Sequence, residues 1–179
     1  MRVVLAASKA DLRILAADGP DDIHALRPLL IGYFEVINTA LASFGETIDF
    51  TPMLNDMLGH TARFLPPDGQ TLYAVDGDRT VGMAFLKPIG PNIELKRLFV
   101  LPEAQGTGLG GRLLNHAISE ARALGGAALY LDTLQGLSTA VRMYEKVGFK
   151  HIPAYPESEV GGNARVAKHG VFMCLDLTA

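Results

Sequence analysis

The residues with the clearest chemistry are the four glycines within residues 105–111, which read QGTGLGG. Glycine lets the main chain approach a phosphate closely, and the loop precedes a segment whose apolar residues recur every three or four positions, as in a helix. The first N–H groups of a helix have no partner within it, and the helix dipole adds roughly half a positive charge at that end. The loop therefore predicts a pyrophosphate site, and the alternative is a glycine-rich turn that binds nothing.

One rival ligand is a dinucleotide, because Gly106, Gly108 and Gly111 satisfy the G-x-G-x-x-G fingerprint. Asp132 follows about twenty residues later, where a Rossmann domain carries its ribose-binding acid. Against this, residues 101–105 separate the preceding strand from Gly106, and the 68 residues after Gly111 are too few for the remaining parallel strand and helix units. A dinucleotide-binding oxidoreductase is the weaker hypothesis.

The elements that position this loop follow from apolar periodicity and turn residues. The expected strands are residues 12–17, 70–76, 80–87, 92–100, 127–133 and 170–177, and the expected helices are 21–42, 51–64, 108–124 and 138–147. The sequence Asp-Gly-Asp at 76–78 is the strongest short hairpin signal in the chain. This order predicts an α/β protein in which helices cover the faces of a mixed sheet.

Composition and charge exclude several classes of protein. The 179 residues are 49% hydrophobic and 20% charged, which is typical of one folded domain over residues 1–179. A formal net charge of -3 and a pI near 5.9 argue against a nucleic-acid partner. No apolar run approaches the ~20 residues of a membrane span and the start does not read as a secretory signal, so we expect a cytoplasmic protein without membrane contact.

The histidines and the single cysteine do not form a metal-ligand pattern. The five histidines show no i, i+4 pair and no cluster with other ligand types, so we predict no metal site. Cys174 lies in an apolar stretch, where we expect it to act as a small apolar residue of a strand. The oligomeric state stays open between a monomer and a homodimer.

Two segments resemble a known family. Residues 105–110, QGTGLG, match Q/R-x-x-G-x-G/A between a strand and a helix, and residues 143–149, MYEKVGF, match L-Y-x-K-x-G-F on a later short helix. Residues 94–149 are therefore similar to the GNAT superfamily of acyl-CoA-dependent N-acyltransferases. The resemblance implies a GNAT-like central mixed, mostly antiparallel sheet of six to seven strands with four helices on its faces. In the first 65 and last 30 residues the resemblance to the family is limited to the expected order of helices and strands.

The resemblance also implies acetyl-CoA as the co-substrate. Main-chain amides of the glycine loop would grip its pyrophosphate, Gln105 would order the loop, Arg112 would reach a phosphate, and the preceding strand would offer main-chain groups to the pantetheine arm. The expected contact residues are Leu98, Phe99, Val100, Gln105, Gly106, Thr107, Gly108, Leu109, Gly110, Gly111 and Arg112. Leu137 is a departure, because many relatives carry an asparagine at this position.

Acetyl transfer to an amine requires the neutral amine. A lysine-like amine with a pKa of about 10.4 is protonated at pH 7, and freeing it costs about 4.6 kcal/mol unless a base removes the proton. Glu94 is the candidate base, directly or through water, because many family members resemble one another in carrying a glutamate there. Glu94, Lys96 and Arg97 place three charges in one central strand, so the alternative is that Glu94 only pairs with its neighbours.

The departing thiolate needs a donor, and Tyr144 is the candidate acid. In the family, the short helix that carries this tyrosine points at the sulfur. A tyrosine pKa of about 10 against a thiol pKa of ~8.5 makes full proton transfer uphill by roughly 2 kcal/mol, so hydrogen bonding to the sulfur matters more than transfer. The alternative is an aromatic side chain packed on the buried helix face.

The expected acceptor is a primary amine of a small molecule or peptide. By resemblance it lies between the first two helices and the C-terminal strands, and acids in residues 21–64 would attract a cation, with Tyr33, Phe34 and Phe44 as an apolar wall. These acids are Asp21, Asp22, Glu35, Glu46, Asp49 and Asp56. An ordinary solvated helix face is the alternative. The alternative function is a module that binds acyl-CoA without turnover.

Overall fold

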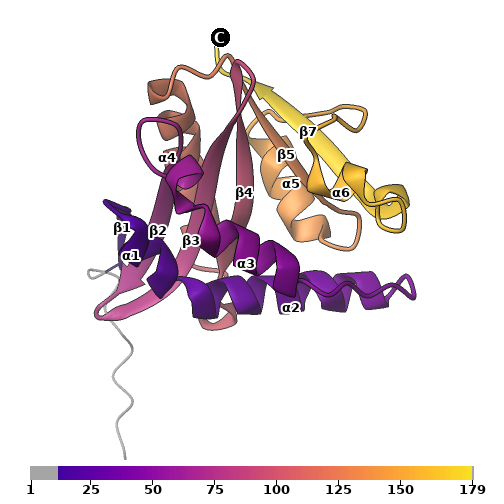
Figure 1. Ribbon diagram of the computed structural model, residues 1–179, viewed down its shortest axis with the longest axis horizontal. Coiled ribbons are helices and arrows are strands. Elements are labelled where there is room, and N and C mark those ends of the chain that lie inside the picture. The colour runs from indigo at the N-terminus through magenta and orange to yellow at the C-terminus, as the bar shows by residue number, and fades with distance from the viewer. Residues whose placement is uncertain (1–11, 179) are drawn as a thin grey trace, which may run out of the picture.

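The computed structural model describes residues 12–178, which form one seven-stranded sheet in the order β1-β2-β3-β4-β5-β7-β6 (Figure 1). The strands are β1 (Leu12–Ala16), β2 (Gln70–Asp76), β3 (Arg79–Ile89), β4 (Asn92–Val100), β5 (Ala128–Leu134), β6 (Lys150–His151) and β7 (Gly170–Asp176). Only β4 and β5 pair in parallel, and the other pairs are antiparallel. The predicted mixed α/β fold is confirmed, and the parallel sheet of a dinucleotide-binding domain is excluded for these residues.

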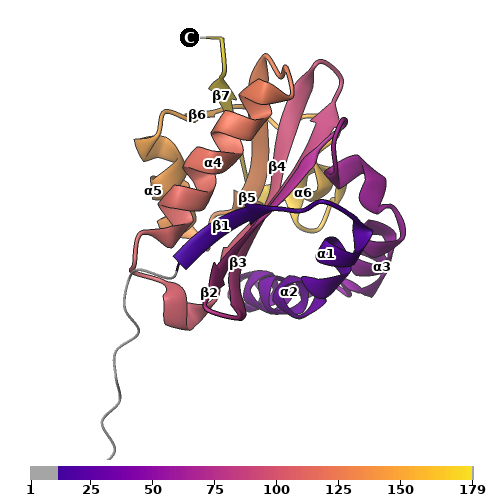
Figure 2. The same ribbon diagram turned by 90° about the vertical axis from the view of Figure 1, so that its left-hand side faces the viewer.

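The helices lie on both faces of the sheet. They are α1 (Pro20–Ala25), α2 (Arg27–Ala42), α3 (Thr51–Gly59), α4 (Leu109–Ala123), α5 (Ser138–Lys146) and α6 (Glu159–Gly162). Figure 2 shows α4 and α5 on one side of the sheet and α1, α2 and α3 on the other. Short 3-10 turns occupy Thr61–Phe64, Pro102–Ala104 and Ala167–His169.

Alternation along β3 divides the apolar core between these two layers. Ala84 and Leu86 belong to the cluster beneath α4 and α5, whereas Met83 and Phe85 belong to the cluster beneath α1, α2 and α3. Successive side chains of a strand point to opposite faces, so a strand buried on both sides reads as a continuous apolar run. The middle of β3 is therefore buried on both faces of the sheet.

A β-bulge in β4 opens the sheet where the site lies. Met83 pairs with Phe99 and Phe85 with Lys96, so Arg97 and Leu98 together oppose a single residue of β3. Arg97 has φ +53°, a left-handed conformation that is uncommon for a residue with a side chain. The parallel ladder between β4 and β5 ends at Leu95, and the two strands diverge towards α2 (Figure 1).

Two expected helices are shorter than their apolar patterns suggested. The helix predicted over 21–42 is two helices that meet at Leu26, because Pro28 has no N–H to donate to the preceding turn. The helix predicted over 51–64 ends at Gly59 and continues as a 3-10 turn. The short helix α6 was not expected either. With it and the division at Leu26, the structure has six helices rather than four in the part that it describes. No helix of residues 12–178 is long and apolar enough to cross a membrane.

Candidate active site

A groove of about 600 Å³ runs between the end of β4, the start of α4 and the start of α5. We call it the cofactor groove. Its lining residues are Tyr33, Val36, Ile37, Leu98, Phe99, Val100, Gln105, Gly106, Gly108, Leu109, Gly110, Gly111, Gly136, Leu137, Ser138, Thr139, Ala140 and Met143. Nine of the eleven residues expected to contact the cofactor therefore lie on one wall, and the exceptions are Thr107 and Arg112.

The glycine loop has the backbone geometry that an anion site requires. Gly106 and Gly108 have φ of +75° and +84°, and Gly108 caps the start of α4. A Cβ added at Gly106, Gly108 or Gly111 would meet nothing within 4 Å, so the space beside these residues is open. Gln105 Nε2 donates to the carbonyl of Val100 at 2.9 Å and ties the loop to the end of β4. The exposed first turn of α4 thus faces an open space, as phosphate binding requires.

The two exceptions make contacts outside the groove. The Thr107 hydroxyl donates to the carbonyl of Ala104 at 2.7 Å, which leaves its main-chain amide as the group that could serve a ligand. Arg112 Nη2 donates to the carbonyl of Leu12 on β1 at 3.3 Å. Its phosphate contact stays a prediction.

A narrow cleft of about 40 Å³ lies where β4 and β5 diverge, and we call it the splay cleft. It is lined by Tyr33, Leu95, Arg97, Leu98, Leu131, Asp132, Thr133, Leu137, Ala140 and Tyr144. Tyr144 is 6% exposed, and burial raises the pKa of its hydroxyl. Burial also raises the pKa of Tyr33 to about 12, against the opposing charges of Arg97 and Lys96. Both phenols are therefore neutral hydrogen-bond donors at pH 7.

Glu94 lies beneath this cleft in a network of buried charges. Its carboxylate is fully buried, contacts Lys96 Nζ at 3.2 Å and Lys87 Nζ at 2.9 Å, and accepts a hydrogen bond of 2.6 Å from the Tyr155 hydroxyl. Glu94 is not among the residues that line the cavities described here. The predicted pairing of Glu94 with Lys96 is thus present, and its carboxylate does not face any of these four cavities.

Lys96 joins three carboxylates at the centre of the network. Besides Glu94, its ammonium contacts Asp132 at 3.1 Å and Glu159 at 3.5 Å. Burial favours the neutral amine, but the carboxylates outweigh it and raise the pKa of Lys96. Burial likewise opposes ionisation of Asp132 and Glu159. Their pKa values are nevertheless lowered, because the charge of Lys96 acts together with hydrogen bonds from Ser158 and Val160 at Asp132 and with the charge of Arg97 at Glu159. Asp132 and Glu159 are therefore charged at pH 7.

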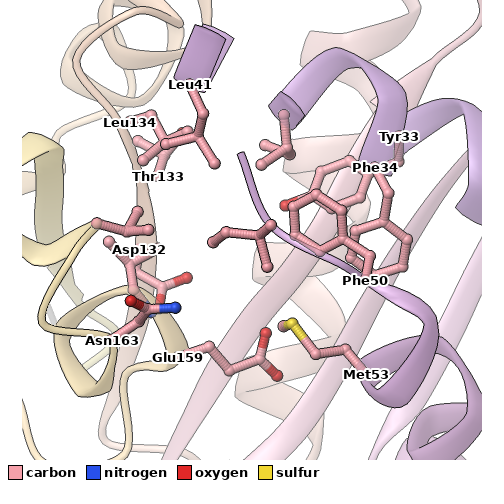
Figure 3. Close-up of a pocket in the computed structure, with 14 residues that line it drawn as sticks. Tyr33, Phe34, Leu41, Phe50, Met53, Asp132, Thr133, Leu134, Glu159 and Asn163 are labelled. Carbon is pink, nitrogen blue, oxygen red and sulfur yellow. The ribbon is translucent and has the colours of Figure 1, made fainter. Parts of the chain in front are cut away.

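A mostly apolar pocket of about 70 Å³ lies between α2, α3, β5 and α6 (Figure 3). We call it the apolar pocket. Its lining is Tyr33, Phe34, Ile37, Leu41, Ile48, Phe50, Met53, Asp132, Thr133, Leu134, Glu159, Val160, Asn163 and Val166. Phe34 and Phe50 stack with ring centroids 4.5 Å apart. Tyr33 lines this pocket, the cofactor groove and the splay cleft, and no other residue among those named for the three does so.

A second pocket beside it is lined by charged residues. This cationic pocket has about 310 Å³ and is lined by Pro52, Met53, Asp56, Met57, Arg63, Phe64, Lys87, Arg97 and Glu159. Arg97 pairs with Glu159 at 3.1 Å and lies over the ring of Phe34, with 5.4 Å to its centroid. Met53 and Glu159 line both pockets, and Figure 3 shows them side by side.

The acids expected to attract an amine are elsewhere. None of the six acids of residues 21–64 lines the apolar pocket, and only Asp56 reaches the cationic one, where it pairs with Arg63. Glu46 pairs with Arg165 and Lys168, and Phe44 stacks on His169. The carboxylates of the apolar pocket come from later elements. Glu159 lies on the short helix α6, for which the sequence showed no signal.

The open glycine loop, the groove along β4 and the sheet divided after its one parallel pair together define an acyltransferase of the GNAT type. Comparison with known proteins agrees. The model of the acetyltransferase (GNAT) family matches residues 33–149, and the chain belongs to this family of enzymes.

Two relatives and two solved structures show how far the likeness extends. An uncharacterized N-acetyltransferase of Schizosaccharomyces pombe is 32% identical over 82% of this chain and 87% of its own. An IAA acetyltransferase of Azospirillum brasilense is 46% identical over 31% of this chain and 37% of its own. A GNAT-family acetyltransferase of Staphylococcus aureus superposes with a TM-score of 0.70 at 20% identity, covering 93% of this chain and 99% of that one. The yncA protein of Salmonella typhimurium, solved with its cofactor acetyl-CoA, gives 0.61 at 21% identity, covering 93% and 94%.

Proposed function

We propose that the protein transfers the acetyl group of acetyl-CoA to a primary amine. The observation that carries this proposal is that Tyr33 lines three cavities: the cofactor groove, the splay cleft and the apolar pocket. A thioester carrier and an amine entering from opposite sides would meet there. Bound acetyl-CoA would supply an activated carbonyl carbon, and the chain supplies binding, orientation and hydrogen bonds.

The glycine loop would hold the pyrophosphate. The amides of residues 106–110 and the dipole of α4 would provide donors and partial positive charge for it, and the left-handed conformations of Gly106 and Gly108 lie beside open space. Leu98, Phe99 and Val100 line the same groove and would offer main-chain groups to the extended arm. Leu137 lines its far wall, so an apolar side chain occupies the place of the family asparagine.

Tyr144 would act on the departing sulfur. When the amine nitrogen bonds to the acetyl carbon, the carbon-sulfur bond breaks and its electron pair stays on sulfur. Because burial keeps the Tyr144 hydroxyl protonated, it can donate a hydrogen bond to that sulfur. Tyr144 has this position in the splay cleft, beside the cofactor groove.

Glu94 would act through the network rather than by touching the amine. Its buried carboxylate holds Lys96, and Lys96 in turn holds Glu159, whose side chain is 37% exposed. Glu159 lines the apolar pocket and can accept a hydrogen bond from the incoming amine. Glu94 is then a positioning residue, and the amine proton leaves through Glu159 or to solvent.

The decisive experiment measures free thiol released from acetyl-CoA in the presence of amines, amino acids, aminoglycosides and peptide N-termini. We expect release with at least one acceptor class, and calorimetric binding of acetyl-CoA but not of NADH. Binding of acetyl-CoA without release from any acceptor would instead favour a binding module. Binding of NADH in its place would overturn the cofactor assignment.

A further inference from the structure

Three positive side chains line the cationic pocket, and none of them has a part in the mechanism above. Arg63, Lys87 and Arg97 come from a 3-10 turn, from β3 and from the bulge of β4. The carboxylates on the same walls are Asp56 and Glu159. The lining is therefore positive by one charge, whereas the apolar pocket next to it carries only carboxylates as charged groups.

The two arginines use only part of their hydrogen-bonding capacity. Arg63 Nη2 donates to Asp56, and Arg97 Nη2 donates to Glu159 at 3.1 Å. The Nε atoms of both are buried without a hydrogen-bond partner among the residues that the structure describes. The side chain of Arg97 is only 3% exposed, so its remaining donors face the interior of the protein. Buried donors of this kind require an acceptor, because an unmade hydrogen bond to a charged group is costly.

A carboxylate matches these donors in shape and charge. Its two oxygens in one plane fit the fork of N–H groups on a guanidinium, and Lys87 adds a compact ammonium that is 19% exposed. About 310 Å³ is ample for a carboxylate with the carbons next to it. A cationic amine, in contrast, would enter a lining that is positive by one charge.

The pocket lies within reach of the expected reaction centre. Arg97 lines both the cationic pocket and the splay cleft, where Tyr144 lies. Met53 and Glu159 form the boundary with the apolar pocket. An acceptor could therefore have its amine at the cleft, its apolar body against the stacked rings of Phe34 and Phe50, and a carboxylate beside Arg97.

We propose that the cationic pocket binds the carboxylate of the acceptor, and that the acceptor is an amino acid with an apolar side chain. This inference rests on the proposed acetyl transfer and adds to it a substrate class. Charge selects the carboxylate end, and the aromatic walls select the side chain.

The first test compares acceptors that differ only in the carboxylate. Phenylalanine is paired with 2-phenylethylamine, and leucine with 3-methylbutylamine, in the thiol-release assay. We expect kcat/KM to be at least roughly tenfold higher for each amino acid, as one charge-assisted contact predicts. If the simple amines are used equally well or better, the carboxylate site is wrong while the acetyl transfer stands.

The second test uses two variants that break the same ion pair. Arg63→Gln removes a positive charge from the pocket, and Asp56→Asn removes the negative charge that opposes it. We expect KM for phenylalanine to rise roughly tenfold in the first and to fall severalfold in the second, with KM for acetyl-CoA unchanged in both. If the ion pair had only a structural role, KM for phenylalanine would change in the same direction in both variants. Arg79→Gln, which breaks the exposed pair with Glu103, is the control and should change neither KM.

A third measurement separates the pocket from the chemistry. Phenylalanine is titrated calorimetrically into the protein in the presence of coenzyme A. Saturable binding that weakens in Arg63→Gln supports the pocket even if no acceptor releases thiol, in which case only the proposed transfer has failed. Absence of binding to the wild-type protein overturns the pocket.

Discussion

The two sides of β4 would recognise their ligands in different ways. On the cofactor side the donors are main-chain amides of a loop, and their directions depend on the left-handed conformations of Gly106 and Gly108. On the acceptor side the polar groups are side chains from distant segments, assembled around Lys96. A main-chain site needs a short run of permissive residues, whereas a side-chain network needs a whole fold. The first is therefore visible in a sequence and the second is not.

Removing Lys96 should have the largest effect, because it tests whether one cation organises the acceptor side. In Lys96→Met the carboxylates of Glu94, Asp132 and Glu159 lose their common partner in a buried place. We expect a loss of about 3–5 kcal/mol in the free energy of unfolding, measured by urea denaturation. Lys150→Met, on the exposed strand β6, should change it by less than about 0.5 kcal/mol. A small loss at Lys96 would mean that the network does not stabilise this side.

The same network should make stability depend on pH in a defined direction. The folded protein lowers the pKa values of Asp132 and Glu159, so their contribution is complete above their ordinary values of 3.8 and 4.5 and is lost as the pH falls through the lowered ones. The raised pKa of Lys96 acts at the other end, with stability lost above 10.5. Between pH 7 and pH 2, the free energy of unfolding should fall less steeply with pH in Asp132→Asn than in the wild-type protein. An unchanged slope would show that Asp132 is not linked to folding.

Tyr144→Phe tests the splay cleft, where the cofactor side and the acceptor side meet. The ring stays in its packed position while the hydroxyl is lost, so we expect kcat for thiol release to fall roughly a hundredfold with little change in acetyl-CoA affinity. Tyr33→Phe is the matched variant, because Tyr33 lines the same cleft. If only Tyr33→Phe slows thiol release, the donor to the sulfur is Tyr33. Tyr73→Phe on β2 is the neutral control.

Gly108→Ala tests the main-chain side. A Cβ there meets no neighbouring atom, so the effect on stability comes from φ of +84° alone, which costs about 1–2 kcal/mol for a residue with a side chain. We expect acetyl-CoA affinity and stability to fall together. Gly111→Ala is the control, because Gly111 is helical and equally uncrowded, and it should gain about 0.5–1 kcal/mol in stability. Equal losses in both variants would show that backbone conformation is not what the loop contributes.

The sequence predicted what depends on local pattern. The strand at 92–100 and the amphipathic helix after the glycine loop follow from neighbouring residues, and the structure has both. The family resemblance implied that Gln105 orders the loop, and the structure has its hydrogen bond to Val100. The break at Leu26 was missed because an apolar periodicity that continues through Pro28 hides it. Sequence patterns therefore predicted best the elements that depend on contacts between residues close together in the chain.

The acceptor side could not be predicted for a physical reason. The charges of Glu94, Lys96 and Arg97 were visible, but their partners Asp132 and Glu159 lie 36 and 63 residues from Lys96 and meet it only through the packing of β5 and α6. The acids of residues 21–64 were more numerous, and most point to surface partners or solvent. Abundance of charge along a chain therefore says little about which charges line a pocket.

Arg112→Gln should have the smallest effect and asks whether the cofactor side relies on side chains at all. The guanidinium donates to the carbonyl of Leu12 on β1, outside the cofactor groove, so a phosphate contact would require it to leave that carbonyl. We expect acetyl-CoA affinity to fall by no more than about twofold, which is well below the effect of Gly108→Ala, because an exposed charge contributes little. A tenfold loss would mean that Arg112 turns to the ligand on binding, and the contrast between main-chain and side-chain recognition would then hold only for the pyrophosphate.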